Sequence, residues 1–426
     1  MSVTTAAPAV RRLEPDEVVA LAPVIARLHA DAYPIMRVTT DAAFEVLVER
    51  ARESATDPER AQWVVAERDG EVVGLEHLYD FTMNVRGRDA FTGGVGGVAV
   101  SLAHKRRGVA RALIAWYLEH YRARGAPFAA LYPFRLDFYR KLGFGYGAPV
   151  YRYRFAPATL RADGADGRVR VLGEADADAV QHCYERLRTT THGLMTRITR
   201  SVVRTLADRE ITMVGVERDG VLRGFMQTTV RLPGDETLRN RDELVVRDLF
   251  AEDHAALAAL IGYLRAQSDQ FARVRIESGD PALFLASDDP RDGSDLAVSP
   301  PAVHRVAEAG LGIMYRIVDL DAALAYVLPE HDTFALRLDV RDDVLPRNSG
   351  AHTFRFAAAG TVRDDAAAPD ATLAIGIGDL SSAVMGSLRV RDLVRYGRAS
   401  VEPASRIAQI DAAFRTDTPP QCATRF

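Results

Sequence analysis

The stretch Val98–Leu113, with the sequence VAVSLAHKRRGVARAL, holds the residues best suited to binding an anion. An apolar strand pattern ends in three consecutive cations and a glycine at 105–108, and a helix pattern begins at once. A glycine lets the backbone approach a ligand, and the first N–H groups of a helix lie at the positive end of its dipole. This arrangement predicts a pyrophosphate site, with a solvated basic turn as the alternative. The residues that would form the site are Arg106, Arg107, Gly108, Val109, Ala110 and Arg111.

Other familiar chemistries lack their residue patterns. The basic turn has a single glycine and no Gly-Lys-Ser/Thr sequence, which excludes a Walker phosphate loop. The 10 histidines show no HxxxH or HExxH spacing, so no metal site is expected. The two cysteines, Cys183 and Cys422, fit neither a disulfide framework nor a zinc site, and we expect Cys183 to lie on the apolar face of a helix.

Composition limits the partners. The 426 residues include 54 basic and 58 acidic side chains, a net charge of -4, so no nucleic-acid partner is expected. The lysines are Lys105 and Lys141, and every other cation is arginine. No run of about 18 apolar residues and no signal-peptide pattern occurs, which predicts a cytoplasmic protein without a membrane partner.

The elements around the basic turn occur in an order that is repeated along the chain. Apolar periodicity predicts helices over 18–30 and 109–125, a hairpin around Asp69-Gly70 and a strand over 92–100. A second copy follows, with a hairpin over 211–230, a strand over 243–250 and a helix over 254–267. Its counterpart of the basic turn is Glu252-Asp253-His254, where the inverted charge would repel an anion.

The last part of the chain has a different pattern. Residues 334–340 and 373–377 alternate between apolar and polar, as half-buried strands do. Helical patterns over 320–328, 380–397 and 405–414 flank them, which predicts a separate α+β domain.

Two motifs of the first copy resemble the GCN5-related N-acetyltransferase (GNAT) superfamily. Lys105–Ala110 (KRRGVA) is similar to its Arg/Gln-x-x-Gly-x-Gly/Ala signature, with lysine in the first position. Phe138–Phe144 (FYRKLGF) is similar to a second element, Tyr-x-x-x-Gly-Phe. The resemblance implies that acetyl-CoA is the co-substrate and that its pyrophosphate lies on the basic turn. Its pantetheine arm would lie along the preceding strand at Val98, Ala99 and Val100.

Over its whole length the chain resembles the Eis (enhanced intracellular survival) acetyltransferases. Their features are a doubled GNAT unit, a sterol-carrier-like domain and a tail that matches here in Asp411-Ala412-Ala413-Phe414, Pro420-Gln421 and Phe426. The predicted fold is α/β, with two GNAT-type domains, the second degenerate, followed by a sterol-carrier-protein-like α+β domain. We expect these domains at 1–155, 156–300 and 301–426.

The same resemblance implies roles for particular residues. Tyr139 would protonate the departing CoA thiolate, and the carboxylate of Phe426 would accept the proton of the amine. Without the resemblance, Tyr139 would be interpreted as a core aromatic residue and Phe426 as a frayed end. The CoA site would extend to Phe134 and Arg135, where the family has a smaller and an acidic residue. Asp31 resembles an acidic acceptor-site residue, with a solvated helix end as the alternative.

The resemblance therefore implies an acetyl-CoA-dependent N-acetyltransferase that acts directly on amines of polycationic acceptors such as aminoglycosides. It also implies a homohexamer. A protein lysine, a polyamine or another small amine is the alternative acceptor. A lipid-binding or assembly protein, acting through the third domain, is the alternative of a different class.

Overall fold

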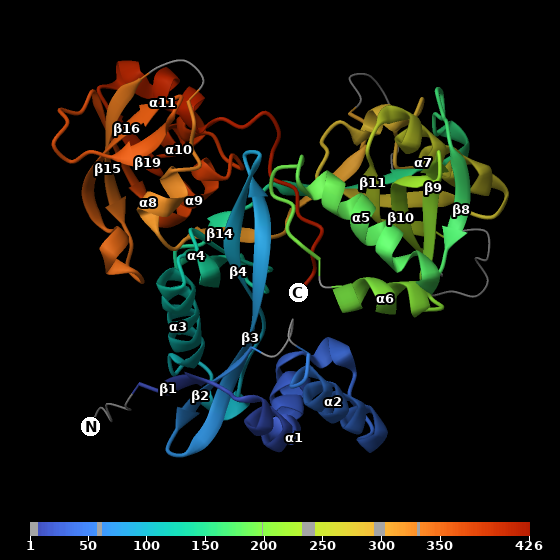
Figure 1. The fold of residues 1–426 in the computed structure, drawn as a ribbon, viewed down its shortest axis with the longest axis horizontal. Helices are drawn as coiled ribbons and strands as arrows, with labels where there is room; N and C mark the ends of the chain where they lie inside the picture. The colour runs from blue at the N-terminus through green and yellow to red at the C-terminus, as the bar shows by residue number, and fades with distance from the viewer. Residues whose placement is uncertain (1–6, 58–61, 198, 232–242, 294–302, 330–332) are drawn as a thin grey trace. The chain divides into compact units, whose positions relative to one another are not determined.

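The computed structural model describes residues 7–57, 62–197, 199–231, 243–293, 303–329 and 333–426. The chain forms two compact bodies, whose elements are drawn in Figure 1. The first comprises Met1–Gly147, Ile313–Thr418 and Arg425–Phe426, and the second comprises Ala148–Gly312 and Pro419–Thr424. Within the described ranges, no helix is both long and apolar enough to cross a membrane.

The first body contains a seven-stranded sheet in the order β1-β2-β3-β4-β5-β14-β6. The hairpin predicted around Asp69-Gly70 is confirmed, because both residues have the positive φ, 54° and 81°, that a tight hairpin turn requires. The long strands β3 and β4 form the next hairpin. The strands are β1 (Ala9–Arg12), β2 (Trp63–Arg68), β3 (Glu71–Val85), β4 (Arg88–Val100), β5 (Phe128–Leu131), β14 (Met314–Ile317) and β6 (Gly145–Tyr146).

Helices cover both faces of this sheet. Successive side chains of a strand point to opposite faces, so Trp63 and Val65 of β2 pack in one core with α1, whereas Val64 packs in the other with α3. We call these sides the α1 face and the α3 face. The helices are α1 (Pro15–Ala32), α2 (Asp41–Ser54), α3 (Val109–Ala123) and α4 (Leu136–Arg140).

The second body repeats this plan in a sheet of the order β13-β7-β12-β11-β10-β9-β8. Its hairpin turn at Asp219-Gly220 has φ values of 54° and 73°, nearly those of the first copy. The strands are β13 (Ala307–Leu311), β7 (Pro149–Phe155), β12 (Arg273–Ser278), β11 (Glu243–Ala251), β10 (Val221–Arg231), β9 (Thr212–Arg218) and β8 (Arg168–Leu172). The helices are α5 (Ala177–Arg188), α6 (Thr199–Ala207) and α7 (His254–Ala266).

The two copies exchange a strand. β7 follows the first copy in the chain but pairs with β12 and β13 of the second sheet. β14 follows the second copy but pairs with β5 and β6 of the first. The domain boundaries expected at 155 and 300 therefore differ from sheet membership. A strand belongs to the sheet with which its backbone pairs. Apolar periodicity does not reveal pairing with a strand that is distant in the sequence.

The last part of the chain contains a five-stranded sheet in the order β17-β16-β15-β18-β19. The single helix predicted over 380–397 is wrong, because Gly386 has a φ of 69° and separates α9 from α10. The strands are β15 (Phe334–Arg341), β16 (Gly350–Ala357), β17 (Gly360–Arg363), β18 (Ala371–Gly376) and β19 (Ala399–Glu402). The helices are α8 (Leu320–Leu324), α9 (Ile377–Val384), α10 (Val390–Arg395) and α11 (Ile407–Phe414).

A buried ion pair joins the first seven-stranded sheet to this part within the first body. Arg316 of β14 and Asp342 after β15 are 2.7 Å apart, and both side chains have 0% exposure. Asp342 also accepts hydrogen bonds from the main-chain N–H groups of Val344 and Leu345 and from the side chain of Asn348. Its carboxylate thus satisfies several groups that water cannot reach.

Replacing Asp342 with asparagine should destabilise the first body, because the buried Arg316 charge loses its partner. The expected cost is roughly 3–5 kcal/mol. Urea unfolding followed by tryptophan fluorescence reports on this body directly, since Trp63 and Trp116 both belong to it. The matched control is Asp343→Asn, which breaks the neighbouring exposed pair with Arg341 and should leave the midpoint almost unchanged. Equal midpoints for the two variants would contradict this account.

Candidate functional site

The strands β4 and β5 part in the middle of the first sheet. Their parallel register ends at the pair Gly94–Ala130, so the edge of β4 beyond Gly94 has no ladder partner on β5. On its other edge β4 has a bulge, because Gly97 and Val98 together lie opposite the single residue Glu76 of β3. The backbone groups of β4 that a ladder would occupy are therefore open to a ligand at this point.

The sequence-predicted residues Val98, Ala99 and Val100 all lie on this part of β4. Val98 and Val100 are partly buried against the core of the α3 face, whereas Ala99 is buried in the core of the α1 face. Main-chain groups along a strand alternate between its two edges, and the resemblance assigns the pantetheine arm to the edge of this stretch that faces away from β3. The structure thus brings the three residues to the place where the sheet opens.

The C-terminal end of α1 holds the bulge in place. The Nε2 of His29 and the Gly97 carbonyl oxygen are 3.0 Å apart, and the Tyr33 hydroxyl donates to the Val98 carbonyl at 3.0 Å. Because a carbonyl only accepts, Nε2 of His29 carries the proton. Burial lowers the pKa of His29 and raises the pKa of Tyr33 to about 12, so both groups are neutral donors near pH 7.

Sequence reasoning missed both of these residues. His29 and Tyr33 are four residues apart at the end of an amphipathic helix, which places them on one helix face. This spacing could have indicated that the two side chains act together. Asp31, the acidic residue that the resemblance suggested, lies between them in α1 and is half-buried.

Phe426 lies on the α1 face where the strands part. Its ring packs against Tyr79, Phe81 and Tyr132, with centroids 5.5, 4.9 and 5.6 Å away. A methyl group on Gly96 would lie 2.9 Å from the main-chain carbon of Phe426 and 3.2 Å from its oxygen. Glycine at this position therefore allows the carboxyl group of Phe426 to rest directly on β4.

Tyr139 is buried on the α3 face, in α4, with 3% exposure. The rings of Phe134, Phe138 and Phe144 surround it at centroid distances of 5.8, 5.1 and 5.8 Å. Burial, with smaller contributions from Tyr33 and Glu76, raises the pKa of Tyr139 well above its ordinary value. The hydroxyl thus holds its proton firmly.

The two positions next to Tyr139 that the resemblance assigns to CoA lie at the start of α4. Phe134 is 69% exposed and covers one side of the Tyr139 ring. Arg135 is the N-cap residue of α4, and its guanidinium pairs with Asp137 at 2.6 Å. This pairing offsets the charge that Arg135 would bring to a phosphate.

The basic turn leads directly into α3. Lys105, Arg106 and Arg107 are exposed, and Gly108 is the N-cap residue with a φ of 82° and no side-chain cap. The first N–H groups of this 15-residue helix, from Val109 onward, are therefore not capped by a side chain. The predicted residues 106–111 are thus brought together in a geometry that fits a pyrophosphate.

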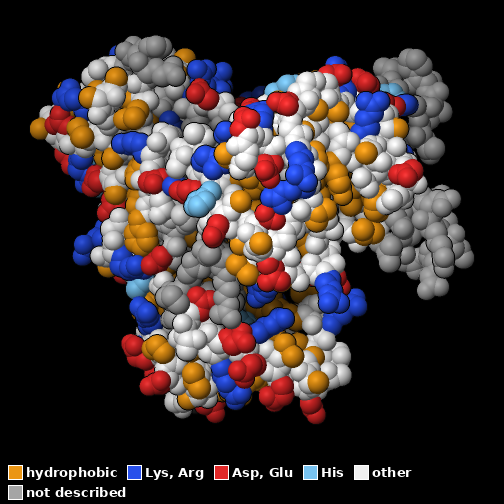
Figure 2. Space-filling view, turned by 45° about the vertical axis from the view of Figure 1, so that its right-hand side comes forward, with side chains coloured by type: hydrophobic (Ala, Val, Ile, Leu, Met, Phe, Trp, Pro, Cys, Tyr) orange, Lys and Arg blue, Asp and Glu red, His pale blue; other side chains and the backbone are white. Residues whose placement is uncertain are grey.

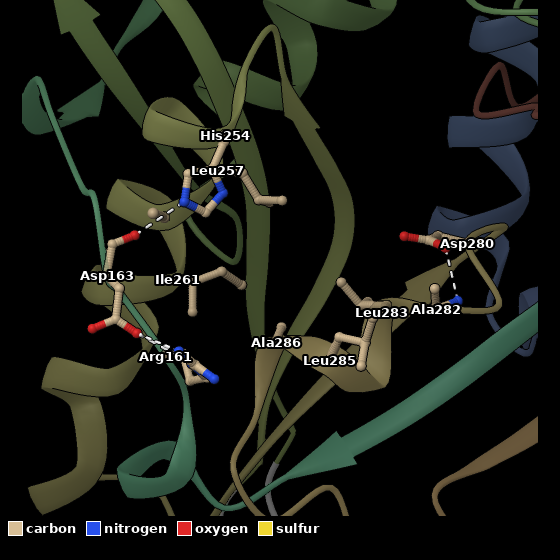
Figure 3. A pocket seen from close by; sticks show the side chains of 11 residues that line it. Arg161, Asp163, His254, Leu257, Ile261, Asp280, Ala282, Leu283, Leu285 and Ala286 are labelled. Carbon is tan, nitrogen blue, oxygen red and sulfur yellow. Dashed lines mark hydrogen bonds and ion pairs between the residues drawn. The ribbon is translucent and has the colours of Figure 1, made fainter.

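The corresponding helix of the second body is closed to anions. Asp253 caps α7 by accepting from the N–H of Ala256 at 2.9 Å, and it is paired with Arg218. A pocket of about 440 Å³ lies beside this helix (Figure 3), and the Nε2 of His254 lies 3.1 Å from the carbonyl oxygen of Asp163 within it. The charge inversion predicted from sequence thus places a carboxylate where the first copy has open N–H groups.

Charge over the rest of the surface is mixed. On the face shown in Figure 2, basic and acidic side chains are interspersed, which agrees with a net charge of -4. Among the residues that the structure describes, no group of three or more His, Cys, Asp or Glu side chains is placed to hold a metal ion.

Comparisons with known proteins agree with this geometry. Residues 10–147 and 187–317 each match a family described as an acetyltransferase (GNAT) domain, and residues 320–423 match a sterol carrier protein domain. The structure of a GCN5-related N-acetyltransferase from Kribbella flavida covers 99% of both chains with a TM-score of 0.75 and 22% identity. The fold and the site therefore define an N-acetyltransferase of the GNAT superfamily.

Relatives that match over most of the chain narrow this class. An uncharacterized N-acetyltransferase of Streptomyces coelicolor is 29% identical and covers 84% of this chain and 87% of its own. The N-acetyltransferase Eis of Mycobacterium tuberculosis is 26% identical and covers 85% and 89%. The structure of Eis1 from Mycobacterium abscessus has a TM-score of 0.77 and 21% identity over 98% of this chain and 100% of that one. Over most of its length the chain is therefore similar to the Eis-like N-acetyltransferases of the GNAT superfamily.

Reversing the charge of the basic turn should weaken the binding of coenzyme A. We expect Arg106→Glu combined with Arg107→Glu to raise the CoA dissociation constant roughly 10- to 100-fold at low salt, with a smaller ratio at high salt. Isothermal titration calorimetry measures this. The control is Arg50→Glu combined with Arg52→Glu on α2, which changes the net charge equally at exposed positions. Unchanged affinity in the first double variant would contradict the pyrophosphate role.

Proposed function

We propose that this protein transfers the acetyl group of acetyl-CoA directly to an amine of a polycationic acceptor, with aminoglycosides as the class. The observation that supports this most is the position of the carboxyl group of Phe426 on Gly96, where β4 and β5 part. A proton acceptor at this point would lie beside the strand along which the acetyl group is expected.

The surroundings of Phe426 suit a cationic amine. A carboxyl group has a reference pKa of about 3.5 and an alkyl ammonium one of about 10, so proton transfer between them is uphill in water. Burial narrows this difference, because it raises the first pKa and lowers the second. The rings of Tyr79, Phe81 and Tyr132 supply an apolar environment whose faces also attract cations.

Tyr139 is suited to protonating the leaving group of the reaction, the thiolate of CoA. Its raised pKa keeps the hydroxyl protonated, so it can donate to a thiolate as that group departs. A main-chain N–H group on the edge of β4 that β5 leaves unpaired beyond Gly94 is the donor that would stabilise negative charge on the carbonyl oxygen. Phe426 lies on the α1 face and Tyr139 on the α3 face. This division supports direct transfer, with the amine entering from one side and the thiol leaving on the other.

Removing Phe426 should abolish most acetyl transfer while CoA still binds, because the new C-terminal carboxylate, on Arg425, no longer rests on Gly96 but the basic turn is intact. Loss of about 100-fold or more in kcat is the expected size for a proton-transfer group. A thiol-release assay measures turnover, and calorimetry measures CoA binding. Phe426→Leu keeps the carboxyl group and should retain more activity than the deletion. Arg425→Ala, at the exposed preceding residue, is the control. Full activity in the deletion variant would refute the role.

A panel of acceptors decides the substrate class. Aminoglycosides, polyamines and lysine peptides are compared under the same conditions. The highest kcat/KM with aminoglycosides supports the proposal. Preference for a polyamine or a lysine peptide would contradict aminoglycosides as the acceptor class but would agree with direct acetyl transfer to an amine. Lipid that co-purifies with a protein inactive on every amine would favour a lipid-binding function.

A further inference from the structure

Glu76 is a buried carboxyl group that the reaction described above does not use. It lies on β3 with 0% exposure, and neither of its oxygens has a hydrogen-bond partner among the described residues. Its strand position places it on the α3 face, as for Leu78 two residues later, and its register partner on β2 is the apolar Val64. An unpartnered carboxyl in such a core is unfavourable, so stability alone does not explain it.

Glu76 lies opposite the bulge of β4, on the edge of that strand that pairs with β3. On the β4 side it faces Gly97 and Val98, neither of which titrates. Two titratable side chains lie in the core of the same α3 face, Tyr117 of α3 and Tyr139 of α4, and the charge of Glu76 raises the pKa of both. The carboxyl group therefore lies behind the strand of the predicted pantetheine arm, on the same face of the sheet as Tyr139.

Of the two phenols, Tyr117 is already satisfied. Its hydroxyl donates to the Gly93 carbonyl at 2.7 Å and accepts from the Ala130 N–H at 3.2 Å. No described residue hydrogen-bonds the hydroxyl of Tyr139. Tyr139 is thus the phenol with hydrogen-bonding capacity left for Glu76.

The protonation state of Glu76 decides what it can do. Burial without a facing cation raises the pKa of Glu76 well above its usual range, so near pH 7 the group is a neutral carboxylic acid and can donate a hydrogen bond. An ionised Glu76 would do the opposite, because its charge raises the pKa of Tyr139 and makes proton release harder.

We propose that Glu76 is a positioning residue for acetyl transfer, which as a neutral acid donates through one water molecule to the oxygen of Tyr139. This inference rests on the proposed function. In the step concerned, the O–H bond of Tyr139 breaks as its proton passes to the sulfur of CoA, and an S–H bond forms. The hydrogen bond from Glu76 stabilises the phenolate that remains until solvent returns a proton to it.

Two substitutions separate this role from a structural one. Glu76→Gln keeps a neutral donor and should keep kcat within about threefold of the wild type at pH 7. Glu76→Leu removes the donor and should lower kcat roughly 10- to 100-fold with little change in KM. It should stay folded by circular dichroism, since leucine removes an unsatisfied polar group. Leu78→Met, the next position on the same face, controls for disturbance of the core.

The pH profile supplies a readout that packing does not affect. In the wild type, kcat should fall on the alkaline side as Glu76 ionises beside Tyr139. In Glu76→Gln this fall should move to higher pH, because glutamine cannot ionise. In a Tyr139→Phe background, Glu76→Leu should cause no further loss. A Glu76→Leu enzyme with wild-type kcat and pH profile, or an undiminished effect in the Tyr139→Phe background, would overturn the proposal.

A measurement without turnover separates this inference from the proposed function. The infrared spectrum should contain a protonated carboxylic acid band that disappears in Glu76→Gln and shifts in Tyr139→Phe. If the wild type acetylates no amine but this band behaves as expected, the proposed function fails and the link between Glu76 and Tyr139 stands. A missing band, or one that Tyr139→Phe does not shift, overturns the link whatever the activity.

Discussion

The parting of β4 from β5 after Gly94 is the constraint on which the site depends. An unbroken ladder would satisfy every backbone group of β4 and leave nothing for a ligand. On the other edge of β4 the bulge at Gly97 and Val98 interrupts the ladder with β3, and the carbonyl groups of these two residues accept hydrogen bonds from His29 and Tyr33. These two side chains, from one helix end, stabilise an opening that strand pairing alone would close.

Burial also determines which side chains around this opening are neutral near pH 7. It lowers the pKa of His29 and raises the pKa of Tyr33 and Tyr139, so these groups are neutral donors near pH 7. The exposed cations at 105–107 lie instead in the turn that follows β4. The site thus combines an apolar centre, where proton affinities are shifted, with a solvated end where a polyanion is favoured.

The amino-acid sequence predicted most reliably the features that depend on residues close together in the chain. The Asp69-Gly70 turn and the glycine entry to α3 follow from short-range chemistry, and both are present. Periodicity indicated that Tyr139 is a core residue, and it is buried, but only the resemblance to a family suggested a role. The strand exchange and the position of Glu76 depend on pairing between distant segments, which no local pattern encodes.

The strand exchange has a consequence for biosynthesis. β14 lies between β5 and β6 in the first sheet, so β5 lacks its second neighbour and β6 lacks the strand it pairs with until Met314–Ile317 has been made. At about 5–20 residues per second, the ribosome needs on the order of ten seconds to reach β14 after β6 has emerged. During that interval the nascent chain exposes an open strand edge, which is a template for aggregation. The catalytic half is therefore the first part to be synthesised but cannot be the first to finish folding.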